Sequence, residues 1–194
     1  MANLTLIYLH GFQSSGLAFK SQLLSRYVNQ QQLPIEVISP DLPDTPDLAL
    51  GFIGELILKQ ADKPVVLMGS SLGGFYANIF CERAGVPAVM INPAIRPHEL
   101  IKNYLGNNVN PNTHKTYELT PSDLHTLKNS YHDRISLDRK RLILLEMGDE
   151  VLDASDAIQY YHGCQMEILQ GGSHHFDHFE PLLPLVTDWV QKQV

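Results

Sequence analysis

One serine of this chain lies in a context that can make a hydroxyl group reactive. Residues 69–73 read Gly-Ser-Ser-Leu-Gly, which matches the pattern G-x-S-x-G with Ser71 at its centre. The apolar run Val65–Met68 before it predicts a buried strand, and helical spacing begins after Leu72. In this pattern a tight strand–turn–helix holds the serine hydroxyl exposed, and the glycines avoid collisions of a Cβ with the neighbouring elements. Ser71 is the predicted nucleophile, whereas Ser70 has the wrong spacing.

A serine hydroxyl is a weak nucleophile at neutral pH, so it needs a base and a third group that orients the base. For this motif the acid follows the serine along the chain and precedes the histidine. Asp149 follows a predicted strand and is the predicted acid. Glu150 and Asp153 are alternatives, although Asp153 also suits the cap of a helix that begins near Ala154.

The predicted base is His174, which follows Gly171-Gly172 at the end of another predicted strand. His175 stays an alternative, and Phe176 is expected to point into the core. A metal site is a further alternative, because His174 and His178 would share a helix face if a helix began early enough. The glycines favour a loop at His174, and no H-E-x-x-H motif accompanies these histidines, so we expect neither metal nor cofactor.

Attack by a serine creates an oxyanion that the site must stabilise. The residue after the nucleophile supplies one backbone N–H donor, here Leu72, and a loop after an earlier strand supplies another. The loop His10-Gly11-Phe12 follows the first predicted strand, so the N–H of Phe12 is the second predicted donor. The alternative is that His10-Gly11 is an ordinary turn.

Strands and helices must alternate to bring these loops together. Six apolar runs predict strands at 4–9, 34–38, 65–68, 87–91, 142–147 and 166–169, and helical spacing predicts helices at 17–31, 47–61, 73–84, 154–162 and 179–193. This alternation indicates an α/β fold, with a mostly parallel sheet of about six strands, helices on both faces, and ligands beyond the carboxyl ends of the strands. The predicted inward faces of the first two helices are Leu17, Leu23, Leu24 and Val28, then Leu48, Phe52, Leu56 and Ile57.

Residues 94–139 are too long for one simple crossover and predict a small cap of one or two helices over the active site. Thr120 suits an N-cap and Pro121 the first helical position. A plain surface insertion is the alternative. Four apolar residues here can line an acyl pocket or pack the cap onto the body: Leu100, Ile101, Tyr104 and Leu105.

Composition limits the function classes. The 194 residues, 44% of them hydrophobic, fit one domain, and the net charge of −7 disfavours nucleic acid or an anionic membrane as partner. Met1-Ala2-Asn3 leads into a strand without a basic region, and no apolar run approaches the roughly 18 residues of a membrane span, so a cytoplasmic protein is expected. Cys81 and Cys164 are expected to be reduced core thiols.

Several short motifs together resemble the small bacterial α/β-hydrolase esterases of the YqiA type: His10-Gly11-Phe12, Pro40-Asp41-Leu42-Pro43, Gly69-Ser70-Ser71-Leu72-Gly73-Gly74, Asn92-Pro93-Ala94, Gly148-Asp149-Glu150-Val151 and Gly172-Ser173-His174. The resemblance covers essentially the whole chain, 1–194, as a single domain. It implies a carboxylesterase or acyl-thioesterase with Ser71, Asp149 and His174 as triad, acting on small to medium acyl esters. The chain departs from the family at His175, where a small residue is expected. A non-catalytic binding protein on this fold and a metal-dependent hydrolase are the alternatives.

Overall fold

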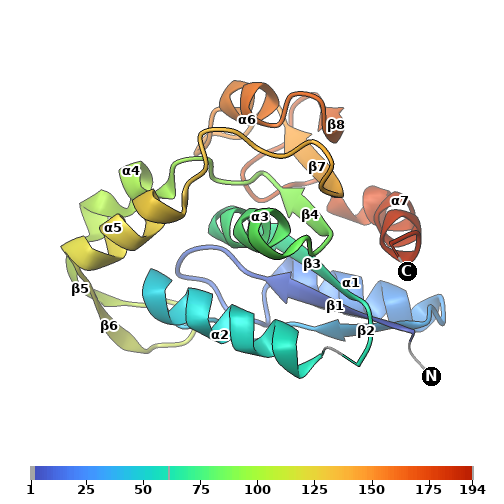
Figure 1. Ribbon diagram of the computed structural model, residues 1–194, viewed down its shortest axis with the longest axis horizontal. Helices are drawn as coiled ribbons and strands as arrows, with labels where there is room; N and C mark the ends of the chain where they lie inside the picture. The colour runs from blue at the N-terminus through green and yellow to red at the C-terminus, as the bar shows by residue number, and fades with distance from the viewer. Residues whose placement is uncertain (1–2, 61, 194) are drawn as a thin grey trace.

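A computed structural model describes residues 3–60 and 62–193, so Met1-Ala2 and the last position of the predicted helix 47–61 lie outside the described residues. Its main sheet is parallel, with the strand order β2-β1-β3-β4-β7-β8. The strands are β1 (Leu4–Leu9), β2 (Ile35–Ile38), β3 (Val65–Ser70), β4 (Ala88–Ile91), β7 (Arg141–Glu146) and β8 (Gln165–Leu169). The predicted strands and their parallel arrangement are confirmed (Figure 1).

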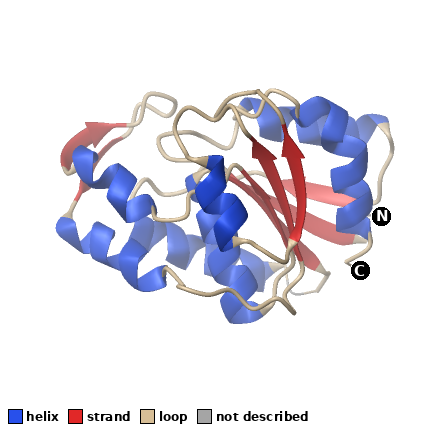
Figure 2. Cartoon of the chain, turned by 90° about the horizontal axis from the view of Figure 1, so that it is seen from above, coloured by secondary structure: helices blue, strands red, loops and turns tan. Residues whose placement is uncertain are grey.

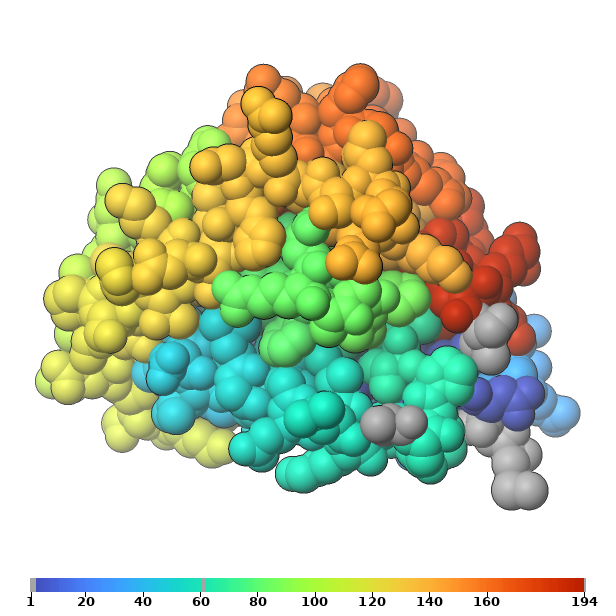
Figure 3. Space-filling view, viewed as in Figure 1, coloured from blue at the N-terminus to red at the C-terminus, as the bar shows by residue number. Residues whose placement is uncertain are grey.

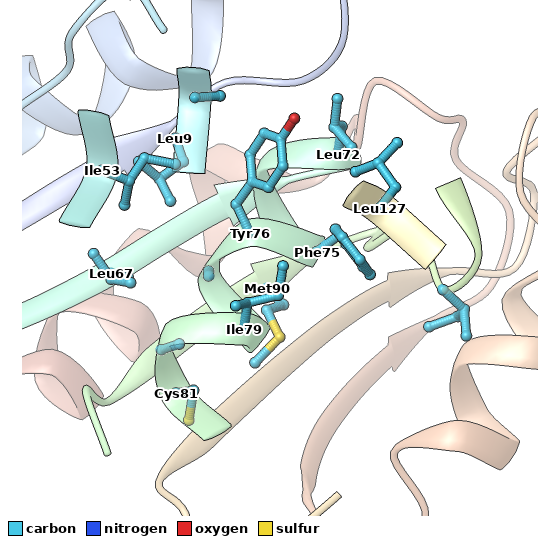
Figure 4. Close-up of a cluster of buried hydrophobic side chains, with 14 of the residues drawn as sticks. Leu9, Ile53, Leu67, Leu72, Phe75, Tyr76, Ile79, Cys81, Met90 and Leu127 are labelled. Carbon is cyan, nitrogen blue, oxygen red and sulfur yellow. The ribbon is translucent and has the colours of Figure 1, made fainter. Parts of the chain in front are cut away.

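Helices cover both faces of this sheet, as predicted. They are α1 (Phe19–Gln30), α2 (Pro46–Lys59), α3 (Leu72–Ala84), α6 (Ala154–Tyr160) and α7 (Phe179–Gln191). Side chains of β1 alternate between two hydrophobic clusters, because successive residues of a strand point to opposite faces. Leu6 and Tyr8 pack in the cluster that includes residues of α1 and α7, whereas Ile7 and Leu9 pack in the one that includes residues of α2, α3 and α6. Figure 4 shows part of the second cluster.

Two predicted helix faces are partly wrong. Leu17 precedes α1 and is 76% exposed, and Leu48 and Phe52 of α2 are 64% and 37% exposed. The α2 residues that are buried are Pro46, Ala49 and Ile53. Apolar residues occur around most of α2, so their spacing alone does not select one face. Packing against the rest of the protein therefore decides which face of α2 is buried.

The segment between β4 and β7, residues 92–140, is called the insert below. It contains α4 (Pro97–Ile101), the 3-10 helix η1 (Lys102–Tyr104), the antiparallel hairpin β5 (Gly106–Val109) and β6 (Thr116–Leu119), and α5 (Pro121–Ser130). Helix α5 begins at Pro121 after Thr120, as predicted, and the N–H and hydroxyl of Thr120 both donate to Asp123. The hairpin was not predicted, because its Asn- and Gly-rich residues have little intrinsic strand preference.

The insert lies at one end of the molecule. Figures 1 and 2 show the β5–β6 hairpin apart from the main sheet, beyond the arrowheads of its strands. Helix α5 packs against α4 and α2, and in the space-filling view the yellow side chains around α5 adjoin those of α2 (Figure 3). Within the described residues, no helix combines the length and apolar character that crossing a bilayer requires.

Candidate active site

Ser71 occupies the sharp turn between β3 and α3. Its backbone angles are φ 55° and ψ −119°, a conformation that costs energy for a residue with a Cβ. A Cβ on Gly69 would overlap the backbone of Gly73, and a Cβ on Gly73 would overlap the carbonyl of Leu9. The glycine spacing therefore has the steric cause that the sequence pattern predicts.

The structure brings the three predicted triad side chains together. His174 Nε2 lies 3.1 Å from Ser71 Oγ, and His174 Nδ1 lies 2.8 Å from Asp149 Oδ2. The loops after β3, β7 and β8 supply these residues, because parallel strands end at one edge of the sheet. The alternative base, His175, has an exposed side chain, and its carbonyl accepts a hydrogen bond from Lys20 Nζ at 2.7 Å. It is the ring of His174 that meets the serine.

The carboxylate of Asp149 is buried, with 2% of its side chain exposed. Besides the His174 ring, it accepts hydrogen bonds from the N–H groups of Val151 and Leu152 at 2.9 and 2.8 Å. Burial alone would favour the protonated form, but these hydrogen bonds outweigh it and lower the pKa of Asp149. The group is therefore a carboxylate at neutral pH and can fix the tautomer of His174 so that Nε2 faces the serine.

The two alternative acids have other roles. Glu150 Oε2 accepts the backbone N–H of His174 at 3.0 Å, which holds the main chain of the histidine rather than its ring. Asp153 caps α6 through Ser155 N–H at 2.8 Å, as its sequence position suggested.

The loop His10-Gly11-Phe12 lies directly against the turn at Ser71. A Cβ on Gly11 would come within 3.3 Å of Ser71 Cβ. The His10 ring is buried, with Nδ1 2.9 Å from Gly11 O and Nε2 accepting Leu42 N–H at 2.9 Å. Burial lowers the pKa of His10, so a neutral ring fits this pair of bonds. In residues 3–60 and 62–193, the N–H groups of Phe12 and Leu72 have no hydrogen-bond acceptor in the protein.

The hairpin of the insert binds residues 13 and 14, which directly follow the His10-Gly11-Phe12 loop. Asn110 is 1% exposed and donates from Nδ2 to Ser14 O at 3.0 Å and to Asp44 Oδ1 at 2.6 Å. Asn112 Nδ2 donates to Gln13 O at 2.7 Å. The sequence analysis missed these residues, because asparagines in a loop give no signal of a partner about a hundred positions away.

The four predicted pocket residues have different surroundings. Leu100 is 39% exposed and lines a cleft of about 100 Å³ together with Pro93 and Leu152. Ile101 is instead buried in the core, so it packs the insert onto the body and does not line an open pocket. Tyr104 is 45% exposed and meets the ring of Phe12 edge-on at a centroid distance of 5.0 Å. Leu105 is also 45% exposed.

The two histidines of the metal alternative face different carboxylates. His178 Nδ1 lies 2.8 Å from Glu146 Oε1, whereas His174 Nδ1 faces Asp149. The described part of the chain brings together no group of three or more histidine, cysteine or acidic side chains that could hold a metal ion. Cys81 and Cys164 are free thiols, as expected, and burial raises the pKa of Cys81 to about 11.

We predict that the environment of Asp149 makes the folding stability of the protein depend on pH. A carboxyl whose pKa is lower in the folded protein than its usual value of about 3.9 stabilises the fold above that value, and this stabilisation is lost as the pH falls through the folded pKa. Measured from pH 7 down to about 3, the Tm of the wild type should therefore fall further than the Tm of Asp149→Asn. Equal declines in the two proteins would contradict the assigned environment.

The chain matches the model of a family described as Uncharacterised protein family (UPF0227) over residues 5–191. Solved structures of the same fold include Est1E from Butyrivibrio proteoclasticus, with a TM-score of 0.75 and 15% identity over 99% of this chain and 88% of the other. A second structure of Est1E has ferulic acid bound. A monoacylglycerol lipase from Paleococcus ferrophilus has a TM-score of 0.75 and 14% identity over 98% and 95% of the two chains.

A putative hydrolase of the alpha/beta superfamily from Xanthomonas campestris pv. campestris matches over 99% of both chains, with 18% identity and a TM-score of 0.65. At these identities the similarity establishes the architecture, which is the α/β-hydrolase fold that the motifs implied. The family model covers nearly the entire length, so the chain belongs to the UPF0227 family and has an α/β-hydrolase fold.

Proposed function

We propose that the protein is a serine hydrolase that cleaves acyl esters or acyl thioesters through an acyl-enzyme on Ser71. The observation that carries the proposal is the chain of contacts from Ser71 Oγ to His174 Nε2 at 3.1 Å and from His174 Nδ1 to Asp149 Oδ2 at 2.8 Å. A nucleophile, a base and an orienting carboxylate at hydrogen-bond distance are the requirements for activating a serine hydroxyl.

The proposed reaction assigns a defined task to each of these residues. His174 accepts the proton of Ser71 as Oγ attacks the carbonyl carbon, and it later gives that proton to the leaving alcohol or thiol. Asp149 orients the ring and stabilises the imidazolium. The N–H groups of Phe12 and Leu72 stabilise the oxyanion, each contributing on the order of 10² to 10³ in rate. Water, activated by the same histidine, then hydrolyses the acyl-enzyme.

The insert is the part of the protein that we propose covers this site. Its hairpin holds residues 13 and 14, which follow Phe12. Tyr104 presents partly exposed apolar surface against Phe12, and Leu100 does so beside Leu152, whose N–H donates to Asp149. The small cleft beside Leu100 is lined by Pro93, Leu152 and several charged side chains and by no residue of the triad, so its volume does not set the length of the acyl group.

A fluorophosphonate probe tests the proposal directly, because only an activated serine reacts with it. The wild type should be labelled on Ser71 and should hydrolyse p-nitrophenyl acetate or butyrate, and the octanoate in the same panel measures the preferred acyl length. Acyl thioesters of the same lengths distinguish the two ester classes, and methyl ferulate belongs in the panel because the similar structure of Est1E has ferulic acid bound. Absence of both labelling and hydrolysis would refute the proposal and favour a binding protein. Hydrolysis that EDTA abolishes, without labelling, would favour a metal-dependent enzyme.

A further inference from the structure

Directly beneath the loop that carries His174 lies a carboxylate for which the proposed mechanism gives no role. Glu146 is the last residue of β7, and its side chain is fully buried. Oε2 accepts the backbone N–H groups of Ser173 at 2.7 Å and Asp177 at 3.0 Å. Oε1 accepts the N–H of His178 and its ring Nδ1, both at 2.8 Å. All four hydrogen bonds therefore go to residues 173–178, on both sides of His174.

Four N–H donors point at this carboxylate, so the site stabilises its ionised form, and they offset the cost of burying a charge. Burial by itself would raise the pKa of Glu146, but the hydrogen bonds from His178, Ser173 and Asp177 outweigh it and lower the pKa below its usual value. Lys20, which donates to the carbonyl of His175, adds a nearby positive charge. The loop is thus folded around a negative charge.

Two further contacts fix the loop to the same point. Asn92, just after β4, accepts the N–H of Glu146 at 3.0 Å and donates to Ser173 O at 3.0 Å, which joins two strand ends to the loop. Gly172 has φ 74°, and a Cβ there would overlap the Glu146 carboxylate. The glycine before Ser173 is therefore required for the loop to close over the acid.

We propose that Glu146 is a positioning residue, which anchors the 172–178 loop on both sides of His174 and thereby keeps the imidazole between Asp149 and Ser71. This inference rests on the proposed function. Glu146 does not touch the reacting atoms, and it acts through the position of His174. A displacement of about 1 Å in a catalytic group can lower a rate by about 10²-fold, so loss of the anchor has a measurable cost even if the fold survives.

The first test is Glu146→Gln, which keeps the size of the side chain but turns one acceptor oxygen into a donor that opposes the N–H groups around it. We expect kcat for p-nitrophenyl acetate to fall by about 10- to 100-fold with KM changed by less than about 3-fold, as for a misplaced base. Glu167→Gln, in the neighbouring strand β8, is the matched control and should keep the wild-type kcat. A wild-type kcat in folded Glu146→Gln would overturn the proposal.

A second pair of variants decides the question if Glu146→Gln does not fold. His178→Asn keeps an N–H donor near the position of Nδ1, whereas His178→Phe keeps only bulk. The kcat of the Asn variant should stay within about 3-fold of the wild type, whereas the kcat of the Phe variant should fall by about 10-fold at a similar Tm. This difference in kcat is expected if the hydrogen bond to Glu146 positions the loop. Equal kcat values in the two variants would overturn the proposal.

A measurement that needs no turnover separates this inference from the proposed function. A histidine N–H that donates to a buried carboxylate gives a low-field proton NMR signal, which His174→Gln and His178→Asn assign to the two rings. In Ser71→Ala, the His174 signal should be present, and in Ser71→Ala/Glu146→Gln it should broaden or disappear. If the wild type shows neither hydrolysis nor probe labelling but this signal still depends on Glu146, the function is wrong and the anchoring is right. A signal unchanged by Glu146→Gln would overturn the anchoring.

Discussion

Ser71→Ala is expected to lower kcat for p-nitrophenyl butyrate on the order of 10⁶-fold, the loss found when the nucleophile is removed from serine hydrolases of other folds. The alanine removes the only atom that can form the acyl-enzyme, Oγ, while the left-handed backbone of the turn stays in place. Steady-state hydrolysis measures the loss. A separate portion of the same protein preparation is treated with the fluorophosphonate probe, which measures labelling. Binding of the substrate should change little, because the hydroxyl contributes to the transition state and not to the general fit.

The matched control is Ser70→Ala, at the neighbouring serine of the same motif. Ser70 is buried at the end of β3, and the hydroxyl that lies 3.1 Å from His174 Nε2 is that of Ser71, not that of Ser70. Its replacement should leave kcat within about 10-fold of wild type and the probe reaction intact. If Ser71→Ala turned over substrate as fast as the wild type and Ser70→Ala lost activity, the nucleophile would be Ser70 and not Ser71.

Asp149→Asn is expected to lower kcat by about 10⁴-fold, the effect of the same change in serine proteases with an unrelated fold. The amide keeps the shape of the side chain and can still accept the N–H groups of Val151 and Leu152 through its oxygen. Its nitrogen then faces His174 Nδ1 as a donor, so the ring must take the tautomer with the proton on Nε2, where it cannot accept the proton of Ser71. A pH series of kcat/KM for both proteins measures the loss.

Asp153→Asn provides the matched control for this variant. Asp153 is four residues away and caps α6, so its replacement by asparagine, another good cap, should alter neither kcat nor Tm appreciably. Equal activities of the Asp149 and Asp153 variants, with loss only in Glu150→Gln, would transfer the acid role to Glu150.

The sequence was sufficient for the regular part of the fold. The inner strands β1, β3, β4 and β7 are short, mostly apolar runs that are buried between helices, and such runs carry their own signal. It was insufficient for the insert, where a hairpin of asparagine- and glycine-rich residues is held by contacts of Asn110 and Asn112 with the distant loop 13–14. It also placed Leu48 and Phe52 inward on a helix whose apolar residues do not define a single face.

For the candidate site, the sequence by itself determined the residue types and their order: a serine between obligatory glycines, then an acid and a histidine after later strands. These follow from local sterics and from the rule that parallel strands end at one edge. Only the tertiary structure decided that the ring of His174, and not that of His175, lies beside Ser71. It also decided that Glu150 accepts the backbone N–H of His174, and that Glu146 lies under the loop 172–178. The physical reason is that each of these contacts joins loops that follow different strands, and no local pattern of residues specifies a contact between distant loops.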